Sequence, residues 1–170
     1  MIKHIIELIH CNYHCVPKGN RYILKESGHA NSKSTGIPAK DNVLICQFDK
    51  DTKKLLPFFN SAVPGALMMA DYIAFVEQGD CCFVYIIELS ASAKKIRQRQ
   101  AAEDFAEYIR NVAIRTSGIS SISFCFRYIV VVDKFPPPRG LTAVGHAFDT
   151  HGKMVWKAGS ELSLHMYSVQ

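Results

Sequence analysis

Hydrophobic residues follow a helical spacing in two stretches of the chain. Near the start, four residues lie three or four positions apart and so share one face of a helix: Ile2, Ile5, Ile6 and Ile9. This spacing predicts a helix over residues 2–10. The second stretch, residues 93–115, predicts the longest helix of the chain. We expect both helices to pack on a sheet.

Runs of apolar and β-branched residues predict the strands. The two strongest runs, residues 67–76 and 82–89, flank Gln78-Gly79-Asp80, which is typical of a hairpin turn. Residues 26–42 are rich in Gly, Asn, Ser and Pro and predict a mobile loop. Further strand candidates are residues 21–25, 43–48, 122–132 (near the sheet centre), 143–148 and 162–167. This order of elements predicts an α/β fold with a mixed sheet flanked by helices.

Length and composition narrow the class of protein. The 170 residues fit one domain, and 48% hydrophobic with 21% charged residues excludes wholesale disorder. The net charge of +5 permits an acidic partner such as nucleic acid without requiring one. We find neither a run of the ~20 apolar residues that cross a bilayer nor the pattern of a signal peptide. We therefore expect a cytoplasmic protein with no membrane association.

The six cysteines are expected to be reduced in that compartment. Three of them lie inside apolar, strand-like runs and should be small buried side chains: Cys46, Cys82 and Cys125. Elsewhere, i, i+4 spacings bring together four possible zinc ligands: His10, Cys11, His14 and Cys15. The alternative is an ordinary helix end, because no second pair of ligands stands at a zinc-finger spacing.

Two carboxylates interrupt the most apolar part of the chain. Asp71 and Glu88 each lie inside a predicted strand. A hairpin turning at residues 78–80 would place Asp71 opposite residues 84–87, with Glu88 one or two residues beyond. Paired carboxylates hold hard cations such as Mg²⁺, which can polarise a phosphate. The alternative is that one carboxylate faces solvent or pairs with Lys or Arg.

The chain around these carboxylates resembles the PD-(D/E)XK, or restriction-endonuclease-like, nuclease superfamily. The resemblance covers roughly residues 40–135 and leaves residues 136–170 as a C-terminal extension of the single domain 1–170. It implies a helix, a three-strand meander, a helix and a further strand, with Asp71 and Glu88 as metal ligands. The matching segments are Ala70-Asp71-Tyr72-Ile73-Ala74-Phe75, Tyr85-Ile86-Ile87-Glu88-Leu89-Ser90 and Arg127-Tyr128-Ile129-Val130-Val131-Val132-Asp133-Lys134.

The chain departs from the family pattern at Ser90, where the family has a lysine that orients the attacking water. A serine hydroxyl can form a hydrogen bond but supplies no positive charge. Lys94, at the start of the long helix, is a candidate for a lysine that has moved. The alternative is that Lys94 extends past the first turn into solvent.

Helical geometry selects a glutamine for the same site. The expected buried stripe of the long helix consists of Phe105, Ile109 and Val112. At ~100° per residue, Lys94 and Gln98 each fall about 20° from Phe105, toward the sheet. The resemblance implies a supporting glutamine on this helix, and its spacing would select Gln100. Periodicity favours Gln98. The family often adds a Glu from the first helix, and neither Glu7 nor Glu26 is assigned that role.

Basic residues cluster beside the proposed site. Lys95, Arg97 and Arg99 follow Lys94 at the start of the long helix and are expected to contact phosphates. The alternative is a solvated charged helix face. A weaker basic group consists of Lys50, Lys53 and Lys54.

Two functions remain open. The first is a Mg²⁺-dependent phosphodiesterase acting on DNA or RNA, with Asp71, Glu88, Lys94 and Gln98 as its catalytic set. The second is an inactive nuclease-like module that binds nucleic acid or a protein partner. Ser90 favours the second function, whereas the two carboxylates and Gln98 favour the first. An oligomer is compatible with either function.

Overall fold

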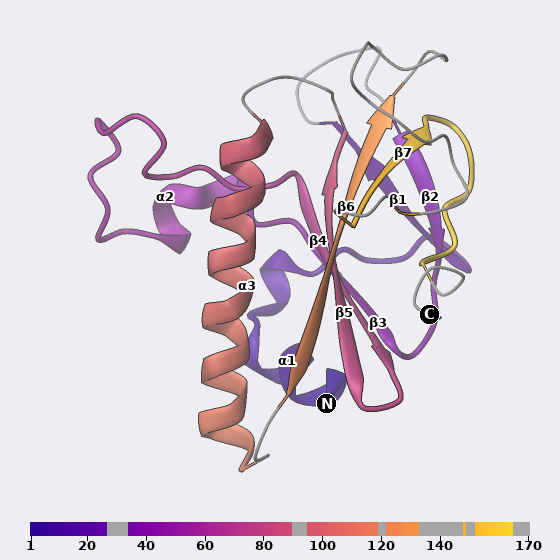
Figure 1. Cartoon of the computed structure of the whole chain (residues 1–170), viewed down its shortest axis with the longest axis horizontal. Coiled ribbons are helices and arrows are strands. Elements are labelled where there is room, and N and C mark those ends of the chain that lie inside the picture. Colours follow the sequence, from indigo (N-terminus) through magenta and orange to yellow (C-terminus); the bar gives the residue numbers. More distant parts are fainter. Residues whose placement is uncertain (27–33, 90–94, 119–121, 133–147, 149–151, 165–170) are drawn as a thin grey trace.

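A five-stranded mixed sheet forms the centre of the molecule (Figure 1). The computed structural model describes residues 1–26, 34–89, 95–118, 122–132, 148 and 152–164. The strand order is β3-β4-β5-β6-β7, in which β3, β4 and β5 are antiparallel neighbours and β6 and β7 continue parallel to β5. The strands are β3 (Val43–Cys46), β4 (Tyr72–Gln78), β5 (Cys81–Glu88), β6 (Ser123–Val132) and β7 (Lys153–Lys157).

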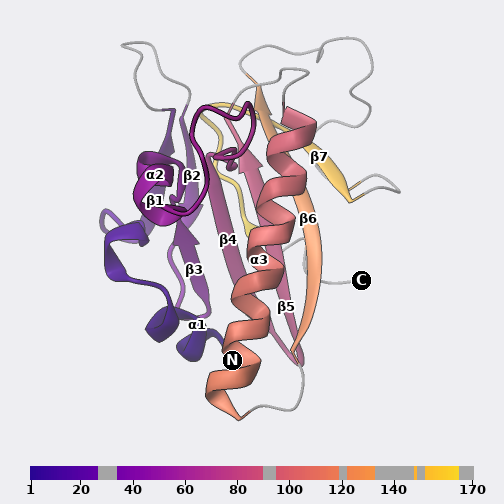
Figure 2. The ribbon, with the colours of Figure 1, turned by 90° about the vertical axis from the view of Figure 1, so that its left-hand side faces the viewer.

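Helices cover one face of this sheet (Figure 2). Helix α3 (Lys95–Ser117) runs along β5 and β6, and α1 (Ile2–Leu8) lies beside it. Alanines at 101, 102, 106 and 113 and an Arg99–Glu103 ion pair favour the helical conformation of α3. Gly118, with φ 70°, follows its last residue and permits the left-handed turn that ends the helix. The shorter elements between α1 and β4 are η1 (Cys11–Tyr13), η2 (Asp49–Asp51) and α2 (Thr52–Leu55).

The sheet is buried on both faces. Alternate residues of β4, β5 and β6 point toward the helices, including Ile73, Ile86 and Val130, which pack with α1 and α3. The intervening residues, including Tyr85 and Ile129, pack on the other face. This double burial explains why the strands read as continuous apolar runs rather than as alternating patterns.

A two-stranded antiparallel sheet of β1 (Arg21–Lys25) and β2 (Ser34–Pro38) covers that second face. Leu24 and Ile37 belong to the core on this side, and Tyr72 Oη donates to the Lys25 carbonyl. The expectation that residues 26–42 form one loop is therefore wrong for residues 34–38. Residues 34–38 form a strand although their sequence is typical of a turn, because pairing with β1 and burial of Ile37 outweigh the local preference for a turn.

Two strand predictions need correction. Residues 67–71 do not belong to β4, because its pairing ends at Ile73 with β3 and at Tyr72 with β5. Strand β7, at Lys153–Lys157, was not predicted. Residues 143–147 and 165–167 lie outside the described part of the chain, and residues 162–164 contain no strand.

The buried stripe of α3 also differs from the prediction. From Arg97 to the end of the helix, the buried side chains are Ala102, Ala106, Ile109 and Ala113. Phe105 is only partly buried and meets Phe48 edge-on, with 4.9 Å between ring centroids. Small alanines let the helix approach the sheet closely, and a pattern search for large apolar residues overlooks them. Cys46 and Cys82 are buried as predicted, whereas Cys125 is half-exposed.

Of the helices in the described ranges, none combines the length and the apolarity needed to span a bilayer.

The packing of β7 can be tested by removing a side chain that its assignment buries. Met154 is fully buried on the face opposite the helices. We expect Met154→Ala to lower the free energy of unfolding by about 2–5 kcal/mol, because it leaves a cavity. As a control, Val16→Ala should cost less than ~0.5 kcal/mol, since Val16 is 80% exposed. Urea denaturation measures both, and equal small effects would contradict the position of β7.

Candidate active site

The register of β4 on β5 brings Asp71 near Glu88. The paired residues run from Gln78 with Cys81 to Tyr72 with Ile87. Asp71 directly precedes β4 and Glu88 is the last residue of β5, so the two carboxylates lie at the same end of this strand pair. The sequence predicted a three-residue turn at 78–80. The turn contains only Gly79 and Asp80, with Gly79 at φ 57°, so the observed pairing is shifted by one residue from the prediction.

Strand alternation directs Glu88 toward α3. Ile86, two residues before Glu88 on β5, belongs to the core on the helix side. Side chains two residues apart share a face of a strand. Glu88 therefore faces α3, and the carboxylate of Asp71 lies close to it, at the backbone N–H of Leu89.

The two carboxylates have different surroundings. Asp71 is half-exposed, and its Oδ2 accepts a hydrogen bond of 2.7 Å from the buried Leu89 backbone N–H. Glu88 has no exposed surface at all. A fully buried glutamate is uncommon because burial removes the hydration of its charged form. Such a residue next to a second carboxylate marks a candidate functional site.

Gln98 is the helix residue that closes this site. It lies one turn before the buried Ala102, and its Nε2 donates to the Met69 carbonyl at 3.2 Å. Met69 lies two residues before Asp71. The contact thus joins the first turns of α3 to the segment that carries the half-exposed Asp71. Gln100, on the other side of the helix, is exposed.

Tyr128, on the neighbouring strand β6, lies close to Glu88 on the helix-facing side of the sheet. It is 5% exposed, lies on the helix-facing side of β6 and pairs with Ile86 in the sheet register. Burial raises the pKa of its phenol. The negative charge of Glu88 acts in the same direction, Arg99 opposes it, and Asp71 adds a smaller increase. Tyr128 therefore keeps its proton and lies within electrostatic reach of both carboxylates and one cation.

Two cations meet the ring of Tyr128. The Arg99 guanidinium carbon lies 5.2 Å from the ring centroid, and the Lys153 Nζ lies 6.0 Å from it. Arg99 also forms a 2.9 Å ion pair with Glu103, which holds the guanidinium in place. Arg99 is half-buried against the sheet, so it does not lie on a solvated helix face. Lys153 could not be found from the sequence because β7 was not predicted.

The other predicted site residues are less closely placed. Arg97 is exposed on α3, and Lys95 is the first residue of that helix. Lys94 and Ser90 lie outside the described residues. Glu7 is exposed on α1, where its side chain is 78% accessible.

The zinc hypothesis for residues 10–15 required a helical turn that presents the four ligands on one face. Helix α1 instead ends at Leu8, and η1 follows as a separate 3-10 turn. In the ranges with assigned structure, no three His, Cys, Asp or Glu side chains gather as metal ligands. Nothing in the fold therefore favours zinc at His10 or Cys11.

Asp71 and Glu88 fit a hard divalent cation better than a structural metal. Mg²⁺ keeps several waters and is commonly held by one or two carboxylates together with substrate phosphates. An adjacent pair of carboxylates without a third ligand meets that requirement. Arg99 and Lys153 supply positive charge on the same face of the sheet.

Comparisons with family models, with curated proteins and with solved structures gave no significant match. The physical arguments for function therefore come from the arrangement of these side chains.

The hydrogen bond from Leu89 to Asp71 can be measured with two substitutions. Asp71→Ala and Asp71→Asn both remove the negative charge, but only Asn keeps a side-chain oxygen as acceptor. We expect Ala to be less stable than Asn by about 1–3 kcal/mol, because it leaves the buried Leu89 N–H without this acceptor.

Chemical denaturation in a metal-free buffer gives this difference. As a control, Asp41→Ala and Asp41→Asn should differ little, since Asp41 is exposed before β3. Equal stabilities of the two Asp71 variants would contradict the hydrogen bond.

Proposed function

We propose that this protein is a divalent-metal-dependent phosphodiesterase that cleaves nucleic acid and has a restriction-endonuclease-like core. The single observation that carries the proposal is that the Asp71 carboxylate, hydrogen-bonded to the Leu89 N–H, lies next to the fully buried Glu88. A core that needed only stability would place an apolar residue at position 88, because an interior glutamate is costly.

The order of elements supports the proposal. Helix α1, the antiparallel strands β3, β4 and β5, helix α3 and the parallel strand β6 follow the order that the PD-(D/E)XK resemblance implies. In this chain, β1 and β2 are inserted between α1 and β3, and β7 is added beyond β6.

Each site residue would have a separate role in such a reaction. Asp71 and Glu88 would hold Mg²⁺, which supplies Lewis-acid polarisation of the phosphate and lowers the pKa of bound water. Gln98 fixes the start of α3 against the Asp71 segment. Arg99 and Lys153 would stabilise the negative charge that develops on the phosphate, which is the role left open by Ser90. Lys94 remains a further candidate for this role.

A second function, an inactive nuclease-like module that binds nucleic acid or a protein, is favoured by one specific observation. Ser90 stands where the family has its lysine. If no other cation reaches the phosphate, the fold would retain binding without catalysis.

Cleavage assays with Mg²⁺ or Mn²⁺ separate these functions. We expect the wild type to cleave DNA or RNA, and Asp71→Asn or Glu88→Gln to lower kcat by on the order of 100-fold or more, because each removes a metal ligand. Asp41→Asn, with its exposed carboxylate outside the site, should retain activity. Activity that appears only in Ser90→Lys would contradict the proposal and identify a decayed catalytic site.

Arg99 has a closely matched control on the same helix. Arg110 also pairs with a glutamate one turn away, and its side chain is 32% exposed against 31% for Arg99. We expect Arg99→Ala to lower kcat by roughly 10- to 1,000-fold, because it removes charge stabilisation at the phosphate. Arg110→Ala should leave kcat unchanged.

Steady-state kinetics and thermal unfolding, measured on the same variants, distinguish a catalytic role of Arg99 from a structural one. Arg99→Lys should recover part of kcat, since it restores the charge but not the planar contact with Tyr128. Equal loss of activity in the Arg99 and Arg110 variants, in step with their stability, would count against the assignment.

A further inference from the structure

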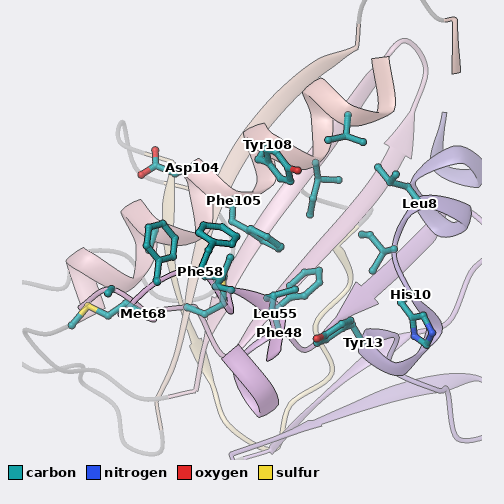
Figure 3. Close-up of a pocket in the computed structure, with 18 of the residues that line it drawn as sticks. Leu8, His10, Tyr13, Phe48, Leu55, Phe58, Met68, Asp104, Phe105 and Tyr108 are labelled. Atoms are coloured by element: carbon teal, nitrogen blue, oxygen red, sulfur yellow. The ribbon is translucent and has the colours of Figure 1, made fainter. Parts of the chain in front are cut away.

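A large, mostly apolar cavity is lined by residues of α3, the α2–β4 segment and the end of α1 (Figure 3). Its volume is about 690 Å³, within the range of small-ligand sites. Helix α3 forms one wall and the segment from α2 to β4 forms another, while the end of α1 and η1 close the far side.

Six Phe and Tyr side chains line the cavity together with aliphatic residues. Two of them stand in the open on the α2–β4 segment: Phe58 is 75% and Phe59 is 50% exposed, with 4.6 Å between their ring centroids. Tyr108 on α3 is 63% exposed. The other aromatic lining residues are Tyr13, Phe48 and Phe105. Exposed aromatic rings around an open cavity provide stacking surfaces for a planar ligand.

Met69 connects the lining of the cavity with the segment that carries Asp71. Met69 lines the cavity and also accepts the hydrogen bond from Gln98. Asp71 lies only two residues further along the chain, and Ala101, on the first turns of α3, lines the cavity from the other side. A molecule that places a phosphate at Asp71 and Glu88 therefore has this cavity next to it.

Positively charged residues lie next to two walls of the mostly apolar cavity. On α3, Arg97 is exposed one turn before Ala101. On the opposite wall, Lys53 and Lys54 are exposed on α2, directly before the lining residues Leu55 and Leu56, and Lys54 also forms an ion pair with Asp51 at 2.7 Å. The carboxylate of Asp104, which also lines the cavity, can accept hydrogen bonds from amino groups of a base edge. This distribution suits a ligand with a flat, weakly polar body and an anionic backbone.

We propose that the aromatic cavity binds an unpaired nucleobase of single-stranded nucleic acid, while its backbone passes between Arg97 and the α2 lysines toward Asp71. The inference rests on the proposed nuclease function and names its substrate class. A base within a duplex must first be unpaired and unstacked before it can enter such a cavity, which costs about a few kcal/mol, whereas a base of a single strand is already available. Stacking on exposed aromatic rings is the common way in which proteins hold single strands.

Binding in the presence of EDTA tests the inference without any cleavage. The probe is a fluorescently labelled oligonucleotide of about 12 nucleotides, compared with its duplex and with an abasic strand that keeps every phosphate. We expect the single strand to bind more tightly than both. The combined change Phe58→Leu and Phe59→Leu should weaken single-strand binding by about 5-fold to over 100-fold, because it removes ring faces and keeps apolar bulk.

Control variants isolate the role of the rings. The combined change Phe58→Tyr and Phe59→Tyr keeps the aromatic faces and should retain affinity. Val16→Ala, an 80% exposed apolar residue that does not line the cavity, should also bind normally. The inference fails if the abasic strand or the duplex binds as tightly as the single strand, or if the leucine variant binds as well as the wild type. Binding of an apolar peptide in place of any oligonucleotide would overturn it as well.

The two proposals fail in different ways. Metal-dependent cleavage of duplexes with no preference for single strands would overturn the cavity assignment and leave the nuclease function standing. Base-dependent binding of single strands without cleavage under any divalent metal would overturn the nuclease function and leave the cavity assignment standing.

Discussion

The register between β4 and β5 is the constraint on which the site depends. Because side chains alternate along a strand, a shift of one residue would turn Asp71 or Glu88 to the other face of the sheet. The register is held by seven residue pairs and by apolar side chains that are buried on both faces. Packing of the whole sheet therefore fixes the relative position of two carboxylates at its end.

The position of Glu88 connects stability with function. An interior carboxylate next to another one destabilises a fold unless cations, hydrogen-bond donors or metal offset its charge. In this protein Arg99 and Lys153 contact the ring of Tyr128, whose hydroxyl lies within electrostatic reach of Glu88. This arrangement places cations beside the paired carboxylates, which is the charge distribution that a phosphate with its divalent cation requires.

Much of this site could be predicted from the sequence. Asp71 and Glu88 stand out because they interrupt apolar runs, and helical periodicity selects Gln98 over Gln100. The role of Arg99 against Tyr128 could not be predicted, because it depends on how closely an alanine-lined helix approaches the sheet. Lys153 and the aromatic cavity were missed for a similar reason. The α2–β4 segment takes its position from tertiary packing, and its proline and glycine residues give it the local sequence of a loop. Strand β7 is only five residues long, and Gly152 and Gly159 lie close to its two ends.

A diffraction experiment on crystals soaked in Mn²⁺ tests the central claim most directly. The account predicts one anomalous peak in contact with carboxylate oxygens of both Asp71 and Glu88, and its loss in crystals of Glu88→Gln. The account is contradicted if, at saturating Mn²⁺, the two side chains point apart or the metal binds elsewhere.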